Sequence, residues 1–187
     1  MAVKRSTYIA AALMLLIAGC TPGADLPPVP EYTMQGYRLG SGDQLRIITF
    51  GEDQLTGEFR VDDQGAIALP LIGTVPAAGQ TTQELNNRIA QLLRKNDLMR
   101  DPRLSIEVVA YRPVFVLGEV ARPGQYPFQP GMTMLTVVAV AGGFTYRGVE
   151  DYAGVVRLTD KKPIEGKIYP SSYIAPNDVI QVFQRRF

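Results

Sequence analysis

Few side chains in this sequence of 187 residues could perform catalysis. It contains no histidine and a single cysteine, Cys20, so neither a Ser-His-Asp nor a Cys-His arrangement can form. The same counts exclude a disulfide within the chain and argue against a zinc site built from His or Cys. An all-oxygen metal site stays open, although no spacing of the EF-hand kind is present. We therefore predict no catalytic residues, no cofactor and no metal.

Acidic side chains occur in three adjacent pairs, within segments that we expect to be turns. These pairs are Glu52-Asp53, Asp62-Asp63 and Glu150-Asp151. A glycosidase needs two carboxylates at a set separation across a sugar-binding cleft. Adjacent carboxylates in turns are more often solvated loop residues. A glycan-processing enzyme is therefore the third of our hypotheses, after the two functions without catalysis that are given at the end of this subsection.

Tyrosine is the other side chain that could recognise a sugar, because its aromatic face can stack on a pyranose ring. The candidates are Tyr111, Tyr126, Tyr146, Tyr152, Tyr169 and Tyr173. The competing interpretation is that most of them pack on the core from strands or sheet edges. The sequence therefore assigns no substrate-binding residue.

The first 20 residues have the pattern of a secretion signal that ends in a cysteine. Lys4 and Arg5 precede an apolar run at 8–18, which is shorter than the about 20 residues of a membrane-spanning helix. The run ends in Leu-Ile-Ala-Gly-Cys, which resembles the lipobox of bacterial lipoproteins. That resemblance implies cleavage before Cys20, acylation of Cys20 and stable anchoring by several acyl chains. The alternatives are an ordinary signal peptide with an incidental Cys, and a buried free Cys.

The residues that follow Cys20 bear on location and partners. Lipoproteins kept at the inner membrane usually carry Asp at the next position, so Thr21 favours a lipid-anchored, periplasm-facing place at the outer membrane. Residues 21–31 hold four prolines without a periodic apolar pattern, which predicts a semi-extended tether that lifts the folded part off the bilayer. Loss of the signal segment changes the formal net charge from +1 to −1, and neither value indicates a nucleic-acid partner.

Up to residue 111 the sequence predicts a small unit of short strands and one helix. We expect strands at 45–50, 59–61, 66–69 and 104–110. Residues 62–65 should form a hairpin loop, with Gly65 suited to a positive φ. Thr81 and Glu84 form a capping box for a helix that should end near Lys95. The apolar stripe of this helix is Leu85, Ile89, Leu92 and Leu93.

The rest of the chain predicts a second unit, organised around 114–145. A strand at 114–117 stops at Gly118, a turn follows at Pro123-Gly124, and a second short strand is expected at 125–128. Thr133 can cap the next helix, 134–141, which is apolar on nearly every side and should be buried. Gly142 and Gly143 should end it. Further strands are expected at 155–158 and at the end of 174–182, with a turn at 160–163.

Several of these motifs, in this order, resemble those of the bacterial polysaccharide export outer-membrane lipoproteins, a Wza-like family. The resemblance is to the short subgroup of that family. The motifs are Tyr37-Arg38-Leu39-Gly40-Ser41-Gly42-Asp43-Gln44-Leu45-Arg46-Ile47, Gly118-Glu119-Val120, Pro123-Gly124-Gln125-Tyr126, Ala141-Gly142-Gly143-Phe144-Thr145 and residues 174–182. The family-motif turn positions are Gly42, Asp43, Gly65, Gly118, Pro123, Gly124, Gly142, Gly143, Asn177 and Asp178. Many relatives carry Gly in place of Asn177, a mild departure because Asn is common in left-handed turns.

The resemblance implies an α+β fold, with a small mixed α/β polysaccharide export domain followed by a ubiquitin-like β-grasp domain of the soluble-ligand-binding (SLBB) type. The expected division is a signal peptide at 1–19, the lipidated Cys and tether at 20–35, the export domain at 36–111 and the β-grasp domain at 112–187. Long members add a second β-grasp module and a pore-forming C-terminal helix. This sequence shows neither, so the resemblance does not extend to a pore formed by this chain alone.

The resemblance also implies a function without catalysis: export of capsular or exopolysaccharide across the periplasm and outer membrane, as part of a homo-oligomeric ring of about eight copies. The implied partners are the polysaccharide chain, an inner-membrane polysaccharide co-polymerase and the bilayer through acylated Cys20, with a separate outer-membrane pore protein as an option. The second hypothesis is a periplasmic module that binds a soluble ligand or glycan and has no transport role.

Overall fold

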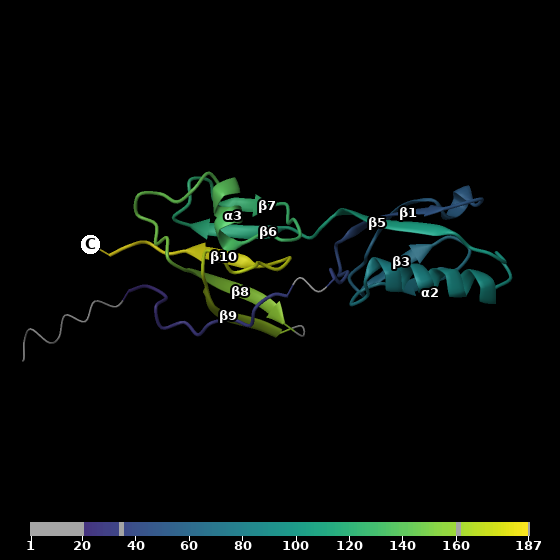
Figure 1. Ribbon diagram of the computed structural model, residues 1–187, viewed down its shortest axis with the longest axis horizontal. Coiled ribbons are helices and arrows are strands. Elements are labelled where there is room, and N and C mark those ends of the chain that lie inside the picture. Colours follow the sequence, from purple (N-terminus) through teal and green to yellow (C-terminus); the bar gives the residue numbers. More distant parts are fainter. Residues whose placement is uncertain (1–20, 34–35, 160–161, 187) are drawn as a thin grey trace, which may run out of the picture.

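The computed structural model describes residues 21–33, 36–159 and 162–186, and it has two lobes arranged end to end (Figure 1). Each lobe has an apolar core of its own. One core is drawn from residues 39–93 and the other from residues 114–182. The α+β fold expected from the sequence is therefore confirmed, with one core per lobe.

The first lobe contains two small sheets and one long helix. Its elements are β1 (Gln44–Thr49), η1 (Asp53–Leu55), β2 (Gly57–Arg60), β3 (Ala66–Leu69), β4 (Gly73–Pro76), α2 (Thr82–Lys95) and β5 (Leu104–Ala110). One sheet has the order β2-β1-β5, with antiparallel pairs, and the other pairs β3 with β4. Leu45 and Ile47 on the inner face of β1 are buried in one core with Leu85, Ile89 and Leu93 of α2.

The start of α2 follows from its local sequence. The Oγ1 atom of Thr81 accepts a hydrogen bond from the Glu84 N–H (3.1 Å), and the Glu84 carboxylate accepts one from the Thr81 N–H (2.8 Å). Both halves of the predicted capping box are thus present. The predicted apolar stripe faces the core, with Leu92 at its partly buried edge.

One prediction for the first lobe is wrong, and one strand was missed. The turn at 62–65 exists, but it does not close a hairpin, because β2 pairs with β1 whereas β3 pairs with β4. Residues 62–65 indicate only that the chain turns there. Whether β2 and β3 pair with each other depends on β1 and β4, which lie outside this segment. Strand β4 itself was not predicted, since its four residues end in a proline.

The second lobe is a five-stranded mixed sheet with a short helix on one face. Its elements are β6 (Val114–Gly118), β7 (Gly124–Tyr126), α3 (Met134–Val140), β8 (Ala153–Thr159), β9 (Lys162–Ile168) and β10 (Val179–Val182). The strand order is β7-β6-β10-β8-β9, in which β10 and β6 are parallel and the other pairs are antiparallel. Met134, Val137 and Val138 of α3 are buried in one core with the inner residues of this sheet.

The structure corrects three expectations in the second lobe. Helix α3 is buried on one face, but its Leu135 and Val140 are exposed, because a single sheet covers a helix from one side. Lys162 and Pro163 lie in β9 and not in a turn, since all of β9 pairs with β8. Residues 160–161 of that predicted turn lie outside the described residues. Strand β9 was missed because Pro163 and Gly166 weaken its strand pattern.

Residues 21–33, which we call the N-terminal segment, do not form the free tether that their prolines predicted. The backbone of Pro28 forms a parallel bridge to Lys167 of β9. The Lys167 N–H donates to the Pro27 carbonyl (2.7 Å), and the Val29 N–H donates to the Lys167 carbonyl (3.3 Å). The prolines limit this pairing to a few bonds, but the segment still lies along β9, beside the second lobe (Figure 1).

Candidate functional site

A buried carboxylate lies where the first lobe meets the chain that leads into the second. Asp43 is fully buried and accepts hydrogen bonds from the Tyr37 hydroxyl (2.7 Å), the Gly40 N–H (2.8 Å) and the Arg112 guanidinium (3.2 Å). Its Oδ1 atom also accepts the Arg112 N–H (3.1 Å). The carboxylate therefore ties the turn before β1 to the first residues after β5. Because these four donors occupy its oxygens, Asp43 serves as a structural group that holds the junction together.

A second buried carboxylate repeats this arrangement before the last strand. Asp178 accepts from the Ala175 N–H (2.7 Å) and from Nη2 of Arg157 (2.7 Å), just as Asp43 accepts from Gly40 and Arg112. The residue before each aspartate has a positive φ, 103° at Gly42 and 68° at Asn177. Asn177 thus occupies the left-handed position that Gly42 fills in the first turn. The two halves of the chain share one device, a left-handed turn whose aspartate is held by an arginine.

Arg157 also reaches two other parts of the second lobe. Its Nη1 atom donates to the Pro30 carbonyl of the N-terminal segment (2.9 Å), and Nη2 donates to the Tyr173 carbonyl (3.2 Å). Burial raises the pKa of Asp178, while Arg157 and the Ala175 N–H act in the opposite direction. The pair therefore links three chain segments at a substantial desolvation cost.

Three aromatic rings pack beside the Asp43 junction and join the two cores. The ring centroids of Tyr37 and Tyr111 lie 4.8 Å apart, and that of Phe128 lies 6.0 Å from Tyr111. Phe128 belongs to the core of the second lobe, and Tyr37 packs against both cores. Burial raises the pKa of the Tyr37 hydroxyl, which donates to Asp43. These contacts limit rotation of one lobe against the other.

Side-chain contacts hold the N-terminal segment on the second lobe in addition to its backbone bridge. The Tyr152 hydroxyl donates to the Pro22 carbonyl (2.9 Å), and Nζ of Lys167 donates to the Ala24 carbonyl (2.9 Å). A Cβ added to Gly166 would lie 2.5 Å from the Pro27 oxygen and 2.7 Å from Val29. The missing side chain at Gly166 is therefore what allows the segment to approach β9 closely.

A groove separates the N-terminal segment from the end of β9 and the loop that follows. Its volume is about 350 Å³. Its walls are Pro28, Val29, Pro30, Glu31, Arg157, Lys167, Ile168, Tyr169, Ser171, Ser172 and Tyr173. Aromatic faces, hydroxyls and proline rings together suit a ligand that has both apolar and hydroxylated faces.

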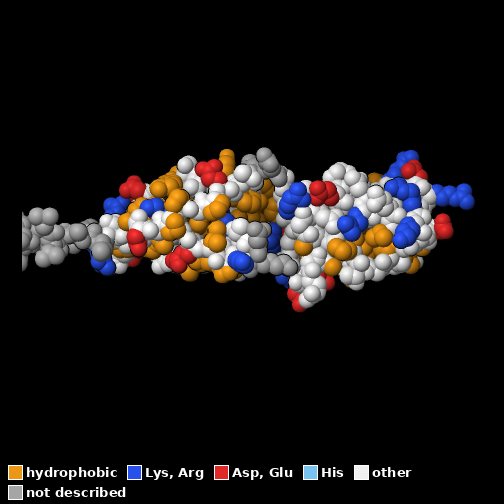
Figure 2. All heavy atoms as spheres, turned by 90° about the horizontal axis from the view of Figure 1, so that it is seen from below, with side chains coloured by type: hydrophobic (Ala, Val, Ile, Leu, Met, Phe, Trp, Pro, Cys, Tyr) orange, Lys and Arg blue, Asp and Glu red, His pale blue; other side chains and the backbone are white. Residues whose placement is uncertain are grey.

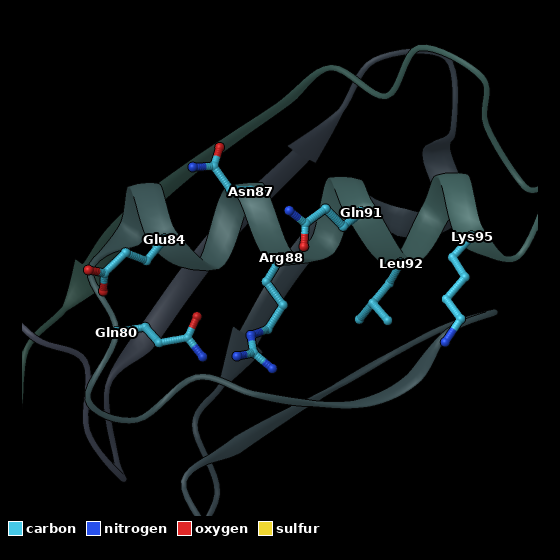
Figure 3. A pocket seen from close by; sticks show the side chains of 7 residues that line it. All are labelled: Gln80, Glu84, Asn87, Arg88, Gln91, Leu92 and Lys95. Carbon is cyan, nitrogen blue, oxygen red and sulfur yellow. The ribbon is translucent and has the colours of Figure 1, made fainter.

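A second hollow, of about 580 Å³, follows the outer side of α2 (Figure 3). It is lined by Gln80, Glu84, Asn87, Arg88, Gln91, Leu92 and Lys95. In Figure 3 the side chains of Arg88, Leu92 and Lys95 point to the same side of the helix. This surface offers amide and charged groups, but no buried polar side chain shapes it into an enclosed site.

The predicted acidic pairs do not come together in the part of the chain that the structure describes. Asp62 is exposed and accepts a hydrogen bond from the Ala66 N–H (2.8 Å), which closes a turn. Glu150 is exposed and pairs with Arg185 (2.8 Å). Glu52 immediately precedes the short helix η1. Among the described residues, no group of three or more Asp, Glu or Cys side chains gathers where it could hold a metal ion.

Of the family-motif positions, Gly118 has the tightest surroundings. It has a φ of 84°, and an added Cβ would collide with the Val182 carbonyl oxygen of the neighbouring strand. Gly65, Gly142 and Gly143 also have positive φ values. Pro123 is exposed in the loop after β6, and Gly124 is the first residue of β7. The glycines among these positions therefore shape the backbone.

The six candidate tyrosines divide into two groups. Tyr111 packs in the aromatic junction, the Tyr126 hydroxyl donates to the Arg122 carbonyl, and Tyr152 holds the N-terminal segment. Tyr146 is exposed, but its ring and hydroxyl contact Arg147. Tyr169 and Tyr173 are the pair that lines one groove. The sequence named these two residues but had no signal that would bring them together.

Cys20, the predicted lipid-anchored residue, lies outside the described residues, which begin at Thr21. No helix in the described part of the chain is both long enough and apolar enough to cross a bilayer.

This geometry defines the class of the protein. It is a two-domain α+β protein whose two buried carboxylates, Asp43 and Asp178, hold separate chain segments together. Comparison with known families gives the particular assignment. Residues 31–109 match the family described as polysaccharide biosynthesis/export protein, and residues 113–170 match the SLBB domain. The chain therefore carries an export domain followed by a β-grasp-like SLBB domain, an arrangement that fits the polysaccharide export family.

Curated relatives agree with this assignment. The chain is 37% identical over 143 residues to the exopolysaccharide production protein ExoF of Rhizobium meliloti (strain 1021), covering 70% of this chain and 32% of the relative. It is 31% identical to the EPS I polysaccharide export outer membrane protein EpsA of Ralstonia nicotianae (strain ATCC BAA-1114 / GMI1000), covering 62% of this chain and 30% of the relative. It is 29% identical to the polysialic acid transport protein KpsD of Escherichia coli, covering 57% of this chain and 19% of the relative. The chain thus spans a third or less of the length of these relatives.

Proposed function

We propose that this protein takes part in the export of capsular or exopolysaccharide across the periplasm and outer membrane. The observation that carries the proposal is the order of the two domain matches, export domain first and SLBB domain second, in one chain. Relatives named for exopolysaccharide production, polysaccharide export and polysialic acid transport support it. The match to the export family favours a transport role without catalysis.

The proposed mode of action is assembly into a homo-oligomeric ring of about eight copies through which polymer passes. Support comes from an uncovered face of the second-lobe sheet. Phe115, Val179 and Val156 lie opposite one another across three strands, on the face turned away from α3. Leu117 and Leu158 lie on the same face, two residues further along β6 and β8. Leu117, Val156 and Leu158 are exposed. Figure 2 views the molecule from the β9 edge of this sheet and shows hydrophobic side chains among charged ones on the second lobe, whereas Lys and Arg side chains gather at the far end of the first lobe. An apolar face of this kind suits a contact between copies.

The proposed anchor is an acylated Cys20 in the outer membrane, with both lobes on its periplasmic side. The N-terminal segment supports a firm attachment, because the residues next to Cys20 are held by Tyr152 and Lys167 of the second lobe. The ring would receive polymer from an inner-membrane polysaccharide co-polymerase. A separate outer-membrane pore protein would complete the path where the ring does not.

Deletion and complementation test this proposal. Deleting the gene should abolish surface polysaccharide, and the wild-type gene should restore it, as measured by uronic-acid or total-sugar assay of washed cells. A Cys20→Ala variant should lose labelling by a palmitate analogue, leave the membrane fraction and fail to complement. Unchanged surface polysaccharide after deletion would contradict the export role. Complementation by an unlabelled Cys20→Ala protein would contradict the lipid anchor alone.

The second candidate is a periplasmic module that binds a soluble ligand or glycan and has no transport role. The groove of about 350 Å³ beside Tyr169 and Tyr173 favours it. Sedimentation of the detergent-extracted protein separates the two candidates, because an export ring should sediment as a closed oligomer and a binding module as a monomer.

A further inference from the structure

The groove between the N-terminal segment and the loop after β9 is built from parts that are distant in the sequence. Residues 28–31 face the end of β9 and the loop after it across the groove, and Arg157 also lines it. The volume of about 350 Å³ falls within the range of about 300–1,000 Å³ that is typical of small-ligand sites. All of its walls belong to the described part of the chain.

The loop that presents the two tyrosines is rigidly held. The Tyr169 N–H donates to Oγ of Ser172 (3.0 Å), and the Ser172 N–H donates to the Tyr169 carbonyl (2.9 Å), so the loop closes on itself. The Met134 N–H at the start of α3 then donates to the Ser172 carbonyl (3.0 Å). Tyr173 pairs with Thr133, and its carbonyl accepts from Arg157. Binding to this loop would cost little ordering entropy.

The side chains of the two tyrosines are nevertheless available. Tyr169 is 48% exposed and Tyr173 is 43% exposed. Within the described residues, neither hydroxyl makes a hydrogen bond and neither ring packs on another aromatic ring, in contrast to Tyr111 and Tyr152. Exposed aromatic rings on a rigid loop are well suited to stack on the C–H face of a pyranose.

The charges around the groove are balanced, which bears on the kind of ligand. Asp178 neutralises Arg157, and Nζ of Lys167 is engaged by the Ala24 carbonyl (2.9 Å). Glu31 adds an exposed carboxylate on the opposite wall. Ser171 lines the groove and is exposed, so its hydroxyl is suited to bond a sugar hydroxyl. A polyanion would gain little here, whereas a neutral glycan would meet both stacking faces and hydrogen-bonding groups.

We propose that this groove is a glycan-binding subsite for a short neutral segment of polysaccharide, with Tyr169 and Tyr173 as its stacking platform and the N-terminal segment as its second wall. The identification of the natural ligand as the exported polymer rests on the proposed function. The presence of the subsite itself does not, because it follows from the geometry of the groove.

Binding of defined oligosaccharides to the full-length protein in detergent tests the subsite. The probes are maltohexaose, cellohexaose, hexagalacturonic acid and fragments released by partial acid hydrolysis of the producing organism's own surface polysaccharide. Saturation-transfer NMR detects contact, and titration calorimetry gives affinity. We expect at least one neutral probe to bind, with an affinity that changes less than about twofold as salt rises, because no net charge is neutralised.

Substitutions then locate the binding. Tyr169→Ala and Tyr173→Ala should each weaken binding by about tenfold, since each removes one stacking face. Tyr173→Phe keeps that face and should bind within about twofold of wild type. Tyr146→Ala is the matched control, because Tyr146 is 77% exposed and contacts Arg147 away from the groove. Urea unfolding curves of all four variants identify any variant that fails to fold.

Three outcomes would overturn the proposal: no probe binds, the two Ala variants bind as well as Tyr146→Ala, or hexagalacturonic acid alone binds and is released by salt. If Tyr169→Ala and Tyr173→Ala both fail to fold, binding is measured instead with Tyr173→Phe and with Ser171→Trp. Unchanged binding by Ser171→Trp then refutes the site. Failure of the export role is separate. It shows as unchanged surface polysaccharide in the deletion strain, while purified protein still binds the probes.

Discussion

Replacement of Asp178 by asparagine should destabilise the second lobe by about 3 kcal/mol. The change keeps the shape of the side chain and removes its negative charge. Arg157 would then be left as a cation without a counter-charge, with its side chain only 7% exposed. Asparagine can still accept one hydrogen bond from Arg157, so the wild-type contacts at 2.7 Å and 3.0 Å would be reduced but not all lost.

The size of the effect follows from the burial of the pair. Removing one partner of a buried ion pair typically costs about 3–5 kcal/mol, because the other charge stays desolvated. Burial already raises the pKa of Asp178 against the attraction of Arg157, so part of the Coulombic gain is cancelled in the wild-type protein. We therefore expect a value at the lower end of that range.

Urea unfolding followed by far-UV circular dichroism measures this cost, since the chain contains no tryptophan for fluorescence. The two lobes have separate cores, so two transitions should be fitted, and the transition of the second lobe is the one that Asp178→Asn should shift. With a urea dependence of about 1.5 kcal/mol/M, the midpoint of that transition should fall by about 2 M.

Glu150→Gln is the matched control, because it breaks an ion pair of similar length (2.8 Å) whose side chains are 45% and 58% exposed. Its cost should stay below about 1 kcal/mol. The Arg157→Met, Asp178→Leu double variant should lose less than the two single changes together, since no charge is left buried. If Asp178→Asn shifts the midpoint no more than Glu150→Gln does, the reasoning about this pair is refuted.

Three further changes test other parts of the structure. Tyr37→Phe should lower the unfolding free energy by about 1 kcal/mol at neutral pH through loss of the bond to Asp43. Because burial raises the Tyr37 pKa above its ordinary value of 10.0, its contribution is complete below that pH and is lost as pH rises further. The melting temperature of the wild type should therefore fall more steeply than that of the variant as the pH rises above about 10. Thr81→Ala should cost about 1 kcal/mol in the first-lobe urea transition, and Gln83→Ala, on the exposed side of α2, should cost about half of that or less. Gly166→Val should displace the N-terminal segment and increase its amide hydrogen exchange and proteolysis. Gly124→Ala is the control and should change neither, because nothing lies within 4 Å of a Cβ added there. Equal protection of the segment in both variants would contradict its close approach to β9.

Elements set by local signals were predictable from the sequence, and α2 is the clearest case. Its capping box and its apolar stripe both lie within the helix or one turn of it, so no distant residue had to be known. Strand β5, Leu104–Ala110, was likewise defined by its own alternating pattern and by the Asp-Pro before it. Both elements appear with the expected bounds.

Elements set by their partners were not predictable in the same way. Strand β9 contains Pro163 and Gly166, which argue against a strand, yet it pairs with β8 along its full length. The N-terminal segment has too few N–H groups for a regular ladder, and its carbonyls bind the side chains of Tyr152, Arg157 and Lys167. Such donors cannot be inferred from the segment itself.

The candidate groove shows the same limit. The sequence named Tyr169 and Tyr173 only as two of six candidate tyrosines, and stacking on a sugar depends on which of these rings stay exposed. The surroundings of these rings depend on Arg157, because it binds the Pro30 and Tyr173 carbonyls and so fixes both walls of the groove. The wall that includes Pro30 was predicted to be a free tether, so no site could be expected there.

The two aspartate turns give a physical reason why the anchor, the groove and the export domain should behave as one body. Asp43 binds Arg112 at the passage between the lobes, and Asp178 binds the arginine that holds the N-terminal segment. A residue at position 20 would therefore be followed within a few positions by chain fixed to the second lobe, and the second lobe is fixed to the first by Tyr37, Asp43 and Arg112. If the proposed anchor at Cys20 is correct, a force on it would reach the export domain through these two aspartate turns.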